Sequence, residues 1–119
     1  MGTLNAKLVL TSSDLTSDVI NMTITDLINV EKNVELKRIT ISTTASNIVA
    51  AASYTKAFVY VKNIDSTIDI NLVKSEGGDH YMTLGPGEFA FFPWATLVDL
   101  QADAASGTPV LEVGIFSKP

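Results

Sequence analysis

The chain has 119 residues and a formal net charge of −5, with 46% hydrophobic and 18% charged residues. This length corresponds to one domain, and the charged content is below the roughly 25% of ordinary soluble domains. The acidic balance argues against nucleic acid as a partner, because phosphate binding needs clustered Lys and Arg. No apolar stretch reaches the roughly 18 residues of a membrane-spanning helix, so no membrane partner is expected. The absence of cysteine excludes disulfides and thiolate metal sites.

The N-terminal half is predicted to contain several strands and little helix. Residues 1–12 are expected to form an extended arm or an edge strand. Residues 13–20 are the one helical candidate, although their apolar face is thin. Residues 20–25 alternate apolar and polar side chains, which predicts a strand with one face in a core. The apolar positions of residues 34–41 change parity, and a β-bulge near Lys37 and Arg38 would absorb the extra residue.

The C-terminal half carries stronger strand signals. Residues 57–61 and 89–92 are continuously apolar and aromatic, which favours strands covered on both faces. Residues 68–72, 98–102 and 111–115 alternate apolar and polar side chains, and Gly, Pro, Asn or Asp residues separate the runs as turns. With strands spaced about 8–12 residues apart, we expect a single all-β domain over residues 1–119. Its predicted fold is an antiparallel β-sandwich, jelly-roll-like, of about eight or nine strands.

Residues 85–90 formally fit the G-x-G-x-x-A dinucleotide fingerprint. That motif needs a helix after it, whereas the aromatic residues 91–92 and Pro93 follow here. The interpretation we favour is a tight turn between two strands, with Gly87 at a positive φ angle.

Two further groups of residues are candidates for chemical sites. His80, the only histidine, follows Asp79 and lies near Ser75, but all three are predicted in one exposed turn without a pocket. Asn63, Asp65 and Asp69 offer oxygens to Ca²⁺, which requires six to eight ligands. A metal centre is disfavoured by the single histidine and the lack of cysteine. We therefore expect no catalytic, cofactor-binding or metal-binding residues, no cofactor and no enzymatic activity.

Three segments of the C-terminal half carry a resemblance to a known class of protein. Residues 58–65 read FVYVKNID, residues 82–93 read MTLGPGEFAFFP, and residues 111–116 read LEVGIF. This pattern resembles the small β-sandwich structural proteins of tailed bacteriophages, especially capsid decoration or cement proteins. The residues that match are architectural, so the resemblance transfers no active residue.

The resemblance implies a non-enzymatic virion structural protein that stabilises the capsid shell. Its implied partners are copies of itself, as a homotrimer, and the major capsid protein, and its implied location is the virion, assembled in the host cytoplasm. The alternative is a carbohydrate-binding or host-adhesion module on a phage tail or head fibre. That alternative requires an exposed aromatic shelf, for which Trp94 and Tyr81 are the candidate pair.

Overall fold

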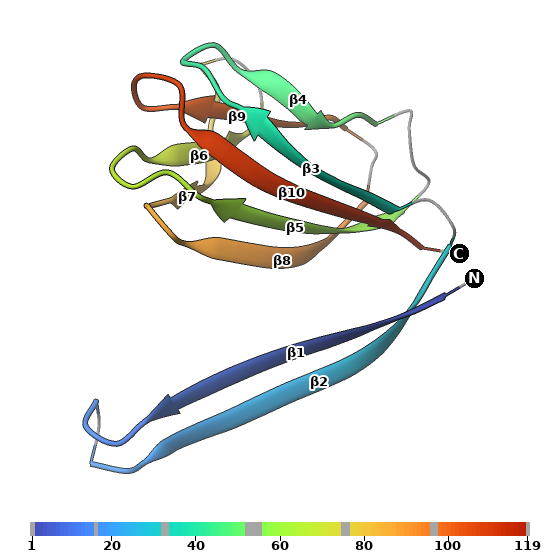
Figure 1. Cartoon of the computed structure of the whole chain (residues 1–119), viewed down its shortest axis with the longest axis vertical. Coiled ribbons are helices and arrows are strands. Elements are labelled where there is room, and N and C mark those ends of the chain that lie inside the picture. Colours follow the sequence, from blue (N-terminus) through green and yellow to red (C-terminus); the bar gives the residue numbers. More distant parts are fainter. Residues whose placement is uncertain are drawn as a thin grey trace.

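The computed structural model of the chain describes residues 2–15, 17–31, 34–51, 56–74, 77–95 and 98–118. These residues form ten β-strands and no helix (Figure 1). The strands are β1 (Gly2–Ser12), β2 (Ile20–Val30), β3 (Val34–Thr40), β4 (Ser46–Val49), β5 (Ala57–Asn63), β6 (Ile70–Val73), β7 (His80–Leu84), β8 (Phe89–Trp94), β9 (Leu100–Ala104) and β10 (Val110–Ser117).

Eight of these strands form a sandwich of two antiparallel sheets. One sheet has the order β3-β10-β5-β8 and the other the order β4-β9-β6-β7. Counted within the sandwich, the first strand therefore pairs with the last, and the second with the last but one, which is the strand arrangement of a jelly roll. The predicted all-β, jelly-roll-like sandwich is confirmed.

The core lies between the two sheets and is filled by alternate residues of the strands. Val59 and Val61 of β5 and Val113 of β10 point inward from one sheet, and Leu72 and Leu100 point inward from the other. All five are essentially inaccessible to solvent. Alternate positions on one strand face one side of a sheet, so period-two patterning of this kind accounts for the sandwich.

One polar residue is completely buried in this core. The side-chain amide of Asn63 donates hydrogen bonds to the carbonyl oxygens of Ile68, at 2.8 Å, and Leu84, at 2.9 Å. Its carbonyl accepts a hydrogen bond from the N–H of Asp65 at 3.0 Å. Because every polar atom of this side chain is partnered, its burial is tolerated, and it joins the end of β5 to the loop before β6 and to the end of β7.

Two local predictions were wrong. The expected β-bulge in residues 34–41 is absent, because β3 pairs with β10 in unbroken register from Val34 to Thr40. The described residues of 13–20 form the loop between β1 and β2 and the first residue of β2 instead of a helix. The Ser12 hydroxyl accepts hydrogen bonds from the N–H groups of Asp14 and Leu15 there, and such local bonds compete with helix formation.

The remaining two strands form a separate hairpin, here called the arm, which comprises β1 and β2. The arm projects from the sandwich beside the outer surface of the β3-β10-β5-β8 sheet (Figure 1). The radius of gyration of the chain is 15.7 Å, compared with about 13.5 Å for a compact domain of this length. The first twelve residues, expected to be an arm or an edge strand, contain β1, which pairs with β2 along its whole length.

The turn between β7 and β8 contains a glycine in a backbone conformation that other residues rarely adopt. Gly87 has a φ angle of +78°, as the sequence predicted, and its N–H donates a hydrogen bond to the carbonyl of Asn63 at 2.8 Å. We expect Gly87→Val to lower the free energy of unfolding by about 1–2 kcal/mol, because residues with a Cβ disfavour this conformation. Gly87→Asn should cost less, since Asn tolerates positive φ. Urea denaturation of the two variants checks this, and equal losses would contradict it.

The part of the chain that the structure describes contains no helix long and apolar enough to cross a membrane.

Candidate assembly surface

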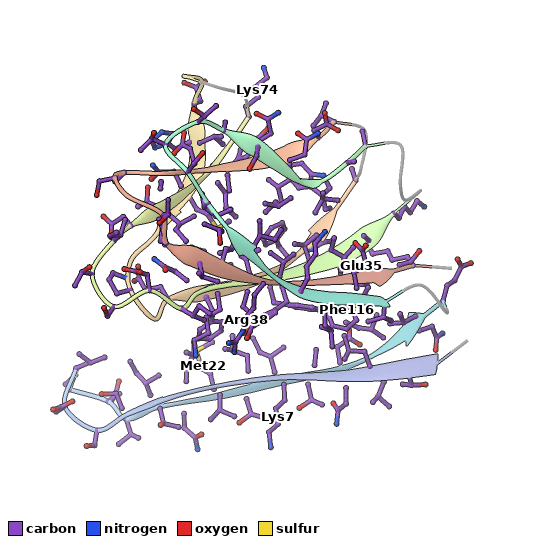
Figure 2. The ribbon with its side chains drawn as sticks, turned by 45° about the horizontal axis from the view of Figure 1, so that its top comes forward. Lys7, Met22, Glu35, Arg38, Lys74 and Phe116 are labelled. Carbon is purple, nitrogen blue, oxygen red and sulfur yellow. The ribbon has the colours of Figure 1, made fainter. Side chains whose placement is uncertain are left out.

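The arm has two chemically different faces. Residues of β1 and β2 that are paired across the hairpin point to the same side, so Leu8 with Ile24 and Leu10 with Met22 share a face. This arm face is apolar apart from Gly2, Ser12 and Asp26, and consists otherwise of Leu4, Ala6, Leu8, Leu10, Ile20, Met22, Ile24, Ile28 and Val30. The opposite face is mostly Thr and Asn. Met22 lies on the side toward the sandwich, whereas Lys7 points away from it (Figure 2).

Most of the arm face is exposed. Leu8 is 39% exposed and Ile24 is 54% exposed, and only Ile28 and Val30, at the end nearest the sandwich, are buried. None of the arm residues belongs to the main hydrophobic core. The prediction that the alternation in residues 20–25 places one face in a core is therefore wrong for this chain: the face exists, but no core covers it.

The outer surface of the β3-β10-β5-β8 sheet is the second exposed apolar surface. This aromatic face is formed by Val34, Leu36, Phe58, Tyr60, Phe89, Phe91 and Phe116. Phe91 stacks on Phe58 with ring centroids 5.7 Å apart and meets Phe116 edge-on at 6.4 Å. Phe89 is 59% exposed and Leu36 is 72% exposed. The sequence predicted strands β5 and β8 to be covered on both faces, but the outward residues Phe58 and Tyr60 are only half-buried, and Phe89 and Phe91 are exposed.

A glycine helps to pack the aromatic face. Gly114 lies on β10 opposite Leu36 of β3. A Cβ atom at Gly114 would come within 3.1 Å of Leu36 Cδ2 and 3.2 Å of the Phe116 ring. The missing side chain therefore leaves space for its neighbours on this surface, which is a common reason for glycine within a strand.

A groove of about 740 Å³ separates the arm face from the aromatic face. Its lining is mostly apolar and consists of Ala6, Lys7, Leu8, Ile24, Asp26 and Ile28 of the arm and of Phe58, Tyr60, Phe89, Ala90 and Phe91 of the sheet. Exposed apolar surfaces of this extent on a small protein mark sites of interaction. The groove is therefore a candidate binding surface between the arm and the sandwich.

Tyr60, Glu112 and Arg38 form a hydrogen-bonded network on the aromatic face. The Tyr60 hydroxyl donates a hydrogen bond to Glu112 Oε1 at 2.8 Å, and Arg38 donates two to Glu112 Oε2 at 3.2 and 3.3 Å. These bonds, from Tyr60 first and then Arg38, hold the pKa of Glu112 below its ordinary value of 4.5. Burial, followed by the hydrogen bond to Glu112, raises the pKa of Tyr60 above its ordinary value of 10.0.

This network predicts a pH dependence of stability. Because the pKa of Glu112 is depressed in the folded chain, its contribution is fully present above pH 4.5 and is lost as the pH falls through the folded-state value. We expect Glu112→Gln to reduce the loss of stability between about pH 6 and about pH 3, although modestly, because the pair with Arg38 is exposed. Denaturant titrations at both pH values check this, and an unchanged difference would contradict it.

The candidate chemical residues that the structure describes lie away from this surface. His80 and Asp79 are exposed at the start of β7, and Ser75 lies outside the described residues. Asn63 and Asp65 are committed to backbone hydrogen bonds, those of Asp65 being with the N–H groups of Thr67 and Ile68. Among the described residues, no group of three or more His, Asp or Glu side chains is arranged to hold a metal ion.

The aromatic pair considered for glycan binding does come together. Tyr81 of β7 and Trp94 of β8 make an edge-on contact with ring centroids 5.7 Å apart. Tyr81 is exposed, whereas Trp94 is half-buried against the core and donates a hydrogen bond to the carbonyl of Val98 at 3.2 Å. One ring of the pair therefore remains available at the surface.

Comparisons with known proteins add information about the fold. No family model and no curated protein matches this chain. It is similar to a solved structure described as Bacillus endospore appendages that form a novel family of disulfide-linked pili, with a TM-score of 0.50 and 14% sequence identity. The match covers 73% of this chain and 87% of the other. At this identity, the similarity shows a shared fold only.

Proposed function

We propose that this chain is a non-enzymatic structural protein that works by self-association, as a capsid decoration protein of a tailed bacteriophage. The observation that carries the proposal is the pair of exposed apolar surfaces, the arm face and the aromatic face, on a chain that is acidic overall. Burial of apolar surface drives most protein association, and net charge keeps separate copies soluble until specific contacts form.

The fold is compatible with this role. Jelly rolls occur in viral capsid proteins, lectins and cupins, and fold alone does not determine function. The related fold in a pilus structure supports a role in assembly. Since this chain has no cysteine, its copies would have to be held together without disulfides.

The major capsid protein is the second partner in this proposal, and a homotrimer is the proposed oligomer, both on the resemblance to decoration proteins. The test is co-sedimentation of the purified chain with capsids that lack it. We expect saturable binding at a fixed ratio of chain to capsid subunit, and capsids that carry the chain should rupture at a higher temperature. Capsids that neither bind the chain nor gain thermal stability would contradict the decoration role.

A second candidate function is glycan binding, which the contact between Tyr81 and Trp94 favours. Aromatic rings that present an exposed face are the feature this function needs. Intrinsic tryptophan fluorescence during titration with a panel of oligosaccharides would detect it. A shift that Tyr81→Ala abolishes would favour an adhesion module over a decoration protein.

A further inference from the structure

We infer that the arm face of one chain packs on the aromatic face of a second copy, so that neighbouring copies exchange arms. This inference rests on the self-association proposed above and specifies the surfaces that carry it. Four observations support it. The arm leaves much of the aromatic face of its own chain exposed, and both faces are apolar. The area that each copy would bury is comparable to that of a protein interface, and the two faces carry opposite charges.

The arm leaves a large part of the aromatic face of its own chain exposed. With the arm in place, Phe91 on one wall of the groove is still 39% exposed, and more than half of the Ile24 side chain on the other wall is accessible. The arm is held at its base by the buried residues Ile28 and Val30 and by a hydrogen bond of 2.9 Å from the Glu31 N–H to the Ser117 carbonyl. These contacts hold the arm away from its own sheet and leave both faces available to another chain.

The size of the arm suits such an exchange. Strands of eleven residues are about 37 Å long, and two strands present a face about 10 Å wide. The arm face is therefore roughly 360 Å² in area. In a ring such as the proposed trimer each copy gives one arm and receives another, so roughly 700 Å² of each copy is buried in total over its two contacts, compared with about 800 Å² per partner in a standard stable interface.

The charges on the two faces are complementary. Asp26 is the one charged residue of the arm face. The aromatic face carries Arg38 and Lys62 against the single carboxylate of Glu112, and the Lys118 ammonium lies 4.2 Å from the Phe58 ring centroid. The arm thus brings a negative charge to a surface with a positive excess, and such complementarity fixes the register of partners.

A second copy is the occupant that these features fit. Every copy carries both surfaces, and exchange of an identical element is a low-cost route to oligomers. Arm exchange would bury both the arm face and the aromatic face of every copy with a single kind of contact.

Photo-cross-linking between two isotopically distinct forms tests the inference without assuming a register. Unlabelled chain carries p-benzoylphenylalanine in place of Ile24, and the unmodified chain is uniformly labelled with a heavy nitrogen isotope. The two are mixed at a dilution that dissociates oligomers, concentrated together and irradiated. The matched control places the same photoreactive side chain at Thr25, on the opposite face of the same strand.

We expect the Ile24 form to yield cross-links between a light arm peptide and heavy peptides that contain Phe58, Phe91 or Phe116, and the Thr25 form to yield few. Light arm peptides joined only to light sheet peptides would show that the arm closes on its own sandwich, which would overturn the inference. Cross-links elsewhere, equal yields from both forms, or none would also overturn it. Sedimentation of the same samples separates the two levels: an oligomer without these cross-links refutes arm exchange alone, whereas a monomer refutes self-association as well.

Discussion

Asn63→Ala should lower the free energy of unfolding by about 2–4 kcal/mol, because each buried polar group left without a partner costs about 1–3 kcal/mol. The substitution removes the amide that serves the carbonyl oxygens of Ile68 and Leu84 and the acceptor of the Asp65 N–H. These partners are backbone groups at the end of β7 and in the loop between β5 and β6, and they have less freedom to find new partners than side chains have. Chemical denaturation of the variant measures the loss.

Asn71→Ala is the matched control for this prediction. Asn71 is also buried, but its amide donates to the Asp103 side chain at 2.9 Å and its carbonyl accepts from the Thr83 hydroxyl at 2.8 Å. Side-chain partners can rotate to find solvent, so we expect a loss of about 1 kcal/mol. If the two alanine variants lose equal stability, the structural role assigned to Asn63 is wrong.

Ile24→Asp should weaken self-association by about 100-fold or more. A charge buried without a partner costs about 3 kcal/mol or more, and each 1.4 kcal/mol is a tenfold change in affinity. Because Ile24 is largely exposed in the isolated chain, the monomer should keep its stability. Sedimentation equilibrium gives the change in affinity, and thermal denaturation of dilute samples verifies the fold.

Thr25→Asp provides the control for the arm, since it adds the same charge to the opposite face of the same strand. We expect it to change self-association little. If both substitutions dissociate the oligomer equally, net charge is responsible and the arm face is not the contact surface. If neither has an effect, the contact lies elsewhere on the chain.

The period-two pattern predicted the sandwich well because it reports directly on side-chain direction. In residues 111–115, Leu111, Val113 and Ile115 alternate with Glu112 and Gly114, and the three aliphatic side chains are buried between the sheets. The positive φ angle of Gly87 was equally predictable, because a turn of this composition requires such a residue. These are local properties, and the sequence carries local information most clearly.

Patterning could not tell which apolar face meets the core and which remains exposed. Met22 and Ile24 alternate with polar residues just as core residues do, yet they lie on the arm. The change of parity in residues 34–41 likewise reflects two apolar faces, with Leu36 on the outer surface and Ile41 in the core. Whether an apolar strand face is buried depends on the chain topology and on contacts with other copies. The alternation of apolar and polar residues reports on neither.

The burial of Asn71 could not be predicted from the pattern either. Asn71 alternates with Ile70 and Leu72 and was expected to face water, but it is buried with Thr83 and Asp103 as partners. Those partners come from neighbouring strands that are distant in sequence. The candidate assembly surface escaped detection for a related reason, since it joins residues from β1, β2, β3, β5, β8 and β10.

Sedimentation velocity of the unmodified chain, over roughly 0.1–100 μM, tests the central claim that the exposed apolar faces are contacts between copies. Interfaces of the size inferred here have dissociation constants from micromolar to picomolar, so the account predicts a defined oligomer that dominates at the upper concentrations and that Ile24→Asp converts to monomer. A chain that sediments as a monomer at every concentration would contradict the account.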